Sequence, residues 1–351
     1  MSFEENIRRV TPYTPGEQPV KKVIKLNTNE CPYPPSPKVS DALKSMDTDA
    51  LRLYSEVTCG TLTDALSSYY GVPKNRIFAG VGSDDVLSMC FLTFFAGKDP
   101  VLFPDITYSF YDVWASVYRI PYETIPLDDD FNIRPTDYHR RNGGVVIANP
   151  NAPTGVILSG ELIEDVISHN KDSVVIVDEA YIDFGGESAL PLIDRYDNLI
   201  VVRTMSKSRA LAGMRIGYCF GNEKLIKYLN DVKYSVNSYT MNTPSLIAGA
   251  KAIEDDEYFK EITGRIIKTR ETFSKSLREL GFTFRDSSAN FVFAKPPVPF
   301  EALELFERLR ERDIFVRHFK KPERISEYLR ITIGTDEEMG ELINALKEIM
   351  K

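Results

Sequence analysis

A lysine, an aspartate and a tyrosine follow apolar runs that are typical of buried strands. Lys207 follows the apolar run of LIVVRTMSK, and Asp178 follows four apolar residues in VVIVDEAY, with Tyr181 three residues later. A charged group at the end of a buried strand loses solvation unless it is paired, neutralised or covalently occupied. An aspartate at such a place could simply cap the next helix, so Asp178 taken alone leaves both interpretations open.

Taken together, these three side chains suit the chemistry of pyridoxal phosphate. A lysine amine binds the aldehyde of this cofactor as a Schiff base, and a carboxylate beside the pyridine nitrogen keeps that nitrogen protonated. The protonated ring accepts the electrons of a broken Cα–H bond, and a phenol can hydrogen-bond the ring oxygen. We therefore predict Lys207, Asp178 and Tyr181 as catalytic, cofactor-binding residues.

A seat for the cofactor's phosphate is predicted in FAGVGSDDVLSMC. Its glycines let the backbone approach an anion, and the helix expected to start near Asp84 points its free N–H groups at that anion. Such a turn is often a simple cap, so the segment alone is weak evidence. Ser206 and Arg215 flank Lys207 and offer a hydroxyl and a guanidinium to the same phosphate. We expect Ser83, Asp84, Ser206 and Arg215 to bind it.

The apolar runs that end in these polar residues predict a parallel β-sheet. Near-continuous valine and isoleucine runs separated by helical patterns are typical of a sheet covered by helices on both faces. In such sheets, ligands bind outside the carboxyl ends of the strands. The runs are VVIANP from Val145, VVIVDEAY from Val174, LIVVRTMSK from Leu199 and IGYCFG from Ile216.

The two ends of the chain differ from this pattern. Residues 1–37 are rich in Pro, Thr and Asn, which predicts an extended arm. After about residue 260, a long helical pattern leads to the short strands FVFAK, IFVRHF and YLRITIG, typical of an α+β unit. We predict an α/β protein with an arm and part of the small domain over 1–40, a large cofactor-binding domain with a mostly parallel sheet sandwiched by helices over 41–260, and a smaller domain over 261–351.

Composition excludes several classes of protein. The formal net charge of −8 over 351 residues argues against binding along nucleic acid, and no apolar run is long enough to cross a membrane. The first residues, MSFEENIRRV, show no secretory signal, so we expect a cytoplasmic protein. Four scattered cysteines and three histidines lack zinc-finger spacing, so we expect no metal site and no disulfide.

With these motifs, the sequence resembles the pyridoxal-phosphate aminotransferases of the aspartate aminotransferase fold and, within them, the histidinol-phosphate aminotransferases. VDEAY followed by SKSRALAGMRIGY is the specific signature of this fold and chemistry. The resemblance spans essentially the whole chain and rests on TPYTPG, LNTNECPYPPS, GVGSDD, FPDITYSFY, NPNAPTG, VDEAYIDF, TMSKSRALAGMRIGY and YLRITIGT.

The resemblance implies roles for individual residues of the cofactor site. Lys207 would bind the cofactor covalently and move the proton between the substrate's α-carbon and the cofactor's C4′. Asp178 would pair with the pyridine nitrogen, Tyr181 would bond the ring oxygen, and Tyr108 would stack on the ring. Tyr54 would reach the phosphate of the neighbouring subunit's cofactor, so the expected active unit is a homodimer.

One departure from the family pattern concerns the ring oxygen. The family usually places an asparagine immediately before PTG, but Ala152 occupies that position here and asparagine falls one residue earlier. Either Asn151 reaches the ring oxygen or Tyr181 bonds it alone, and we favour Asn151.

Substrate recognition is expected to rest on two arginines and a tyrosine. In YLRITIG, alternation places Arg330 on the face opposite the apolar residues, so its side chain can face a cleft while the strand stays anchored. A surface arginine is otherwise the commoner interpretation. The resemblance implies that Arg330 binds the carboxylate of glutamate, and that Arg317 and Tyr13 help to hold the phosphate of histidinol phosphate.

The function that the resemblance implies is transamination between histidinol phosphate and 2-oxoglutarate in histidine biosynthesis, with pyridoxal phosphate and small-molecule substrates. A related aromatic aminotransferase or a threonine-phosphate decarboxylase is the alternative. A non-catalytic pyridoxal-phosphate-binding regulator is a remote alternative, because we expect no room for a DNA-binding helix-turn-helix before the arm motif.

Overall fold

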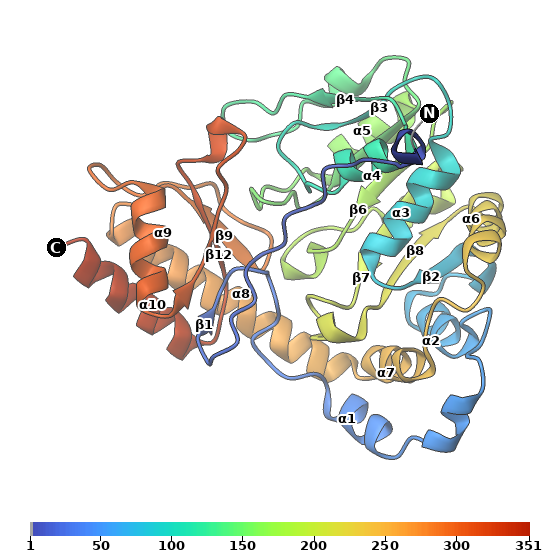
Figure 1. The fold of residues 1–351 in the computed structure, drawn as a ribbon, viewed down its shortest axis with the longest axis horizontal. Helices are drawn as coiled ribbons and strands as arrows, with labels where there is room; N and C mark the ends of the chain where they lie inside the picture. The colour runs from blue at the N-terminus through green and yellow to red at the C-terminus, as the bar shows by residue number, and fades with distance from the viewer. Residues whose placement is uncertain (1–2) are drawn as a thin grey trace.

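One large β-sheet organises the computed structural model, which describes residues 3–351 (Figure 1). Its strand order is β2-β8-β7-β6-β5-β3-β4, and the pairs from β7 to β4 are all parallel. This arrangement confirms the predicted α/β class with a mostly parallel sheet. The strands are β2 (Ile77–Gly80), β3 (Val101–Pro104), β4 (Tyr122–Ile125), β5 (Gly144–Ala148), β6 (Val175–Asp178), β7 (Leu199–Thr204) and β8 (Gly217–Gly221).

The run IGYCFG forms strand β8, which is antiparallel to both of its neighbours and so departs from the parallel arrangement expected for it. Residues 205–216, between β7 and β8, contain only the short 3-10 helix Ala212–Met214. A parallel return needs a crossover connection, usually an α-helix. Because none is present, the chain turns back beside β7, and residues 205–216 form a loop at its carboxyl end.

Helices cover both faces of the sheet, as predicted. Neighbouring residues of a strand point to opposite faces; in β6, Val175 and Val177 enter one core and Ile176 enters the other. The first core is covered by α2 (Gly60–Tyr70), α5 (Gly160–His169) and α7 (Thr243–Glu254), and the second by α3 (Ser83–Phe94), α4 (Tyr111–Tyr118) and α6 (Glu223–Val236).

A smaller unit packs beside the large sheet (Figure 1). Its antiparallel sheet has the order β11-β12-β9, and its core includes Leu26 of the arm. The domain limits predicted at residues 40 and 260 fall inside α1 and α8 and stay predictions. The elements are α1 (Pro37–Lys44), which packs on α7, α8 (Asp256–Glu279), α9 (Ala302–Glu311), α10 (Asp336–Ile349), β9 (Phe291–Ala294), β11 (Arg317–His318) and β12 (Leu329–Thr332).

The N-terminal arm joins the two units. Near its start, the Arg8 guanidinium donates to the carbonyl of Val117 in α4, and farther on β1 (Ile24–Lys25) pairs in parallel with β10 (Ile314–Phe315). Figure 1 shows the arm, in dark blue, running from the side of α4 to the small sheet. Over residues 3–351, no helix is long and apolar enough to cross a membrane.

Candidate active site

A cavity of about 540 Å³ opens where the carboxyl ends of the central strands meet the arm and the small sheet. This is the place where open α/β sheets bind ligands. All of the predicted site residues except Asn151 and Tyr54 line it: Tyr13, Ser83, Asp84, Tyr108, Asp178, Tyr181, Ser206, Lys207, Arg215, Arg317 and Arg330.

Lys207 lies in the cavity two residues past Met205, in the loop that follows β7. Its Nζ donates a hydrogen bond to the carbonyl oxygen of Thr28 at 3.2 Å. Burial and the nearby charge of Arg330 lower the pKa of Lys207 to about 8, against the opposing effect of Asp84. A larger fraction of this amine is therefore neutral near pH 8 than of an exposed lysine.

Asp178 ends β6 and is buried. Its carboxylate accepts hydrogen bonds from the Tyr111 hydroxyl at 2.9 Å and from the Ala180 N–H at 3.2 Å. Burial raises the pKa of Asp178 to about 6, although these two hydrogen bonds act to lower it. The sequence reasoning missed Tyr111, which follows the predicted Tyr108 by three residues and is the first residue of α4.

The start of helix α3 forms a cradle at the edge of the cavity. Gly82 has a φ of 86°, and a Cβ there would lie 2.6 Å from a guanidinium nitrogen of Arg215. Glycine is therefore required both for the left-handed backbone and for the close approach of the arginine. Ser83 begins the helix, and Asp84 pairs with Arg215 at 3.1 Å through its side chain. Free N–H groups and a guanidinium together make this a site for an anion.

Two tyrosines line the same cavity as the lysine and the aspartate. The Tyr108 hydroxyl donates to Asp84 at 2.8 Å. The Tyr181 hydroxyl accepts a hydrogen bond from the Asn29 amide at 3.0 Å, and its ring centroid lies 5.8 Å from Nζ of Lys207. Asn29 belongs to LNTNECPYPPS, which marked the resemblance, but sequence reasoning assigned it no role.

Arg317 and Arg330 face each other directly across strands β11 and β12. In residues 3–351, neither guanidinium has a carboxylate within ion-pair distance. Residues opposite each other on one sheet face lie about 5 Å apart between Cβ atoms, and like charges so placed repel. Arg330 also keeps a buried Nε without a hydrogen-bond partner in that range. Two guanidiniums without a carboxylate partner make this pair a candidate site for an anion.

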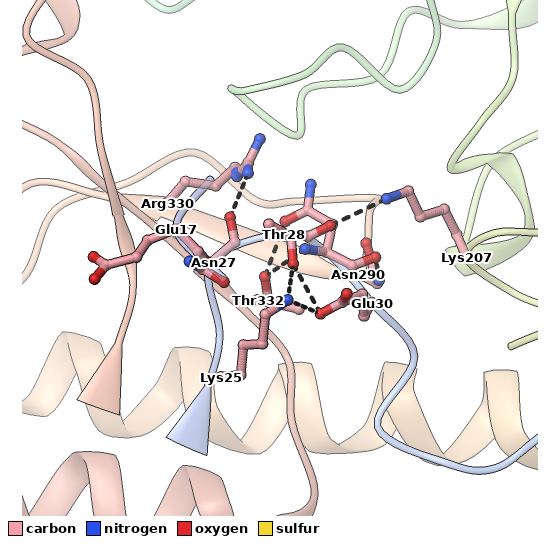
Figure 2. A network of polar contacts seen from close by, with 10 residues as sticks. Glu17, Lys25, Asn27, Thr28, Glu30, Lys207, Asn290, Arg330 and Thr332 are labelled. Carbon is pink, nitrogen blue, oxygen red and sulfur yellow. Dashed lines mark hydrogen bonds and ion pairs between the residues drawn. The ribbon is translucent and has the colours of Figure 1, made fainter. Parts of the chain in front are cut away.

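A turn of the arm contacts both Arg330 and Lys207 (Figure 2). The carbonyl of Asn27 accepts from Arg330 at 2.9 Å, and that of the next residue, Thr28, accepts from Lys207. Lys25 pairs with Glu30 and donates to the Thr28 hydroxyl at 2.5 Å. Burial would raise the pKa of Glu30, but hydrogen bonds from Lys25 and Thr28 lower it. The arm thus holds Lys207 and Arg330 through two successive carbonyls.

Two predicted residues lie outside the cavity. The Asn151 amide is buried and donates to the Ile106 carbonyl at 2.9 Å, while its oxygen accepts from Thr107. These bonds tie the amide to the loop that follows β3, and Asn151 is not among the residues that line the cavity. Its role toward the ring oxygen stays a prediction. Tyr54 is 82% exposed and stacks on Tyr239 with ring centroids 4.5 Å apart. A role toward a neighbouring subunit stays a prediction.

Away from the cavity, two histidines share one carboxylate. His139 and His169 both approach Asp165, and their donor atoms lie within 4.8 Å of one another. The Nδ1 atom of His169 is 2.9 Å from the Asp165 carbonyl, a contact that closes the last turn of α5. This cluster is explained as a hydrogen-bonded helix end, and we derive no metal site from it.

Comparison with known proteins identifies the family. Residues 21–346 match the model described as aminotransferase class I and II. The chain belongs to the class I and II aminotransferase family. The histidinol-phosphate aminotransferase of Lactococcus lactis subsp. cremoris strain MG1363 is 49% identical over 352 residues, with coverage of 100% of this chain and 98% of that relative.

Solved structures of aminotransferases share the fold. The histidinol-phosphate aminotransferase of Sinorhizobium meliloti in complex with pyridoxal-5′-phosphate has a TM-score of 0.83 and 25% identity, covering 94% of this chain and 91% of that one. The aspartate aminotransferase of Thermus thermophilus with maleate has a TM-score of 0.80, 20% identity and coverage of 93% and 91%. These similarities confirm the predicted family and the aspartate aminotransferase-like fold.

The cavity of this aminotransferase fits pyridoxal phosphate. A primary amine, a buried carboxylate and a helix start with an adjacent arginine are the groups that bind its aldehyde, its pyridine nitrogen and its phosphate. Lys207, Asp178 and the Gly82 cradle supply these groups around one cavity.

Proposed function

We propose that the protein is a histidinol-phosphate aminotransferase that uses pyridoxal phosphate to move an amino group between histidinol phosphate and 2-oxoglutarate in histidine biosynthesis. The observation that carries this proposal is the pair Arg317 and Arg330, opposed across two strands beside the lysine and the aspartate. Relatives about 49% identical over their full length carry the same name.

The chain's own residues supply binding and proton transfer. Bound pyridoxal phosphate supplies an electron sink for the electrons of the broken Cα–H bond. Asp178 holds the proton on the pyridine nitrogen, and the Lys207 amine, with its pKa lowered to about 8, accepts the proton from the substrate's α-carbon. Ser83, Ser206 and Arg215 hold the phosphate, and Tyr108 covers the ring.

Substrate selection belongs to the arginine pair and the arm. Both substrates carry an anion next to the carbon that bears the amino group: glutamate has its α-carboxylate there, and histidinol phosphate has a phosphate ester on the adjoining CH2 group. A guanidinium binds either anion through two parallel hydrogen bonds. We assign Arg330 to both substrates, and Arg317 with Tyr13 mainly to the phosphate. Tyr13 is held at the cavity by stacking on Phe110 with ring centroids 4.3 Å apart.

We also propose that the active unit is a cytoplasmic homodimer. Tyr54 and its neighbour Leu53 are exposed by 82% and 58%, and an exposed apolar cluster of this kind is typical of an interaction surface. Sedimentation velocity of the purified protein should give one species of twice the chain mass, and a monomer at micromolar concentration would contradict it.

A panel of amino donors tests the function. Purified protein loaded with pyridoxal phosphate is supplied with 2-oxoglutarate and either histidinol phosphate, phenylalanine or tyrosine, and glutamate formation is measured. We expect the highest kcat/KM with histidinol phosphate. Preference for an aromatic amino acid would support an aromatic aminotransferase. In a separate assay with threonine phosphate, release of carbon dioxide would support the decarboxylase.

A further inference from the structure

Asn29 of the arm is buried and fixed by hydrogen bonds of its backbone. It is 1% exposed and adopts a left-handed backbone with a φ of 55°. Its N–H donates to the Thr332 hydroxyl at 3.0 Å, and its carbonyl accepts from the Asn290 amide at 3.0 Å. Such a conformation persists only where the surroundings impose it.

These contacts fix which way the Asn29 amide points. The Thr332 hydroxyl already accepts the Asn29 N–H, so its single proton is free to be donated to Asn29 Oδ1, which lies 3.0 Å away. With the hydroxyl proton on Oδ1, Nδ2 is the atom that faces Tyr181 at 3.0 Å, so both polar atoms of the Asn29 side chain have a partner. The hydrogen-bond network assigns this orientation of the amide.

The orientation of the amide decides the orientation of the Tyr181 hydroxyl. Because Nδ2 of Asn29 donates to the phenol oxygen, the phenol proton must point elsewhere. No second hydrogen bond to this hydroxyl occurs within residues 3–351, and Tyr181 lines the cavity. Burial raises the pKa of Tyr181, against the opposing effects of Arg330 and Asn29, so the hydroxyl keeps its proton at neutral pH. A donor is thus aimed into the cavity.

The side chains of Asn151 and Ala152, which follow β5, offer no free hydrogen-bond donor to an acceptor in the cavity. Ala152 lines the cavity with a methyl group, and the Asn151 amide is engaged with Ile106. Thr332 lies on β12 two residues after Arg330, so the two side chains share one face of that strand. The strand that carries the substrate arginine therefore also fixes the amide behind Tyr181.

We propose that Asn29 is a positioning residue that turns the Tyr181 hydroxyl into a hydrogen-bond donor toward the ring oxygen of the bound cofactor, with Thr332 holding Asn29 in place. This inference rests on the proposed function, because it concerns the cofactor of that site. It extends the site to an arm residue that touches the cofactor only through the tyrosine.

The test follows the pH titration of the visible absorbance of the bound cofactor. Asn29→Gly keeps the left-handed backbone but removes the amide, and Thr332→Val removes the hydroxyl, whereas Thr332→Ser keeps it. We expect Asn29→Gly to shift the titration midpoint in the same direction as Tyr181→Phe, by roughly half to one pH unit. Thr332→Val should shift it less, and Thr332→Ser should restore the unaltered midpoint.

Combination with Tyr181→Phe separates positioning from general disturbance. If Asn29 acts through the phenol, Asn29→Gly should add no further shift when Tyr181→Phe is already present. Three results would overturn the proposal: an unaltered midpoint in Asn29→Gly, a shift by Asn29→Gly that is equally large with and without Tyr181→Phe, or equal effects of Thr332→Val and Thr332→Ser. Because histidinol phosphate turnover is measured on the unaltered protein, failure of this inference leaves the proposed function standing.

Discussion

At the scale of single residues, burial prepares the reactive groups. Asp178 and Lys207 both lie where desolvation disfavours their charged forms, which raises the pKa of the first to about 6 and lowers that of the second to about 8. Each then gains most from a partner of opposite charge or from a covalent bond. Burial of these two groups thus lowers the free energy of unfolding of the cofactor-free protein, and binding of the cofactor can offset that loss.

Replacement of Asp178 tests this residue-scale account. Asp178→Asn keeps the size of the side chain but removes the charge that holds the proton on the pyridine nitrogen. We expect kcat to fall roughly 100- to 1,000-fold or more, measured in steady state at saturating cofactor. Tyr111→Phe, which removes a hydrogen bond to the same carboxylate, is the matched control and should lower kcat by less than about tenfold. A near-normal kcat in Asp178→Asn would contradict the assignment.

At the scale of elements, the start of α3 and the loop after β7 together form the proposed anion site. The loop runs back into the antiparallel β8, which brings Arg215 beside Gly82 rather than away from the site. Gly217, at the start of β8, lets the backbone of that strand lie close to the start of α3, since a Cβ there would overlap the backbone nitrogen of Ser83. The short connection between β7 and β8 therefore places Arg215 beside the start of α3.

The cradle predicts a specific effect of adding one methyl group. Gly82→Ala should strain the left-handed backbone and push against Arg215, at a cost of about 1–2 kcal/mol, which is about tenfold in the Kd of the cofactor. The Kd is measured by titration of the cofactor-free protein. Gly97→Ala is the control, because a Cβ there meets nothing within 4 Å. Equal Kd values for both variants would rule out a phosphate seat at Gly82.

Much of the site could be predicted from the sequence because its polar residues end apolar strands. Lys207 and Asp178 break buried runs, and Arg330 alternates with apolar neighbours, so local patterns expose them. The antiparallel direction of β8, the partner Tyr111 and the amide of Asn29 could not be read in this way. They depend on a short return loop, on helix packing and on a contact between residues 29 and 181, which are far apart in sequence.

At the scale of the whole molecule, two units meet across one cavity and the arm spans them. Lys207 lies in the loop after β7 of the large unit and donates to the carbonyl of Thr28, and Arg330 lies on β12 of the small unit and donates to the carbonyl of Asn27. Neither unit alone contains a complete site. Because the Lys207 amine is buried where these units meet, its protonation makes the free energy of unfolding of the whole chain depend on pH.

The sign of this dependence follows from the pKa of Lys207. Since the folded pKa of about 8 lies below the ordinary lysine pKa of 10.5, the unfolded chain binds more protons between these pH values. The free energy of unfolding should then rise with pH across this window because of Lys207. In cofactor-free protein, Lys207→Met should be more stable than the unaltered chain by roughly 1–3 kcal/mol at about pH 7, with the gap narrowing toward about pH 10. A gap that is constant in urea titrations at both pH values would show that Lys207 is not desolvated.

The central claim is that this aminotransferase distinguishes two anionic substrates with two opposed arginines. Single-turnover kinetics measure each half-reaction separately, as the change in cofactor absorbance after mixing with histidinol phosphate or with glutamate. Loss of a hydrogen bond to a charged group costs roughly 1.5–3 kcal/mol, or about tenfold and more. Arg317→Ala should therefore slow the half-reaction with histidinol phosphate by at least that factor more than the half-reaction with glutamate, whereas Arg330→Ala should slow both. Equal losses for the two donors in Arg317→Ala, or no turnover of histidinol phosphate by the unaltered enzyme, would contradict the account.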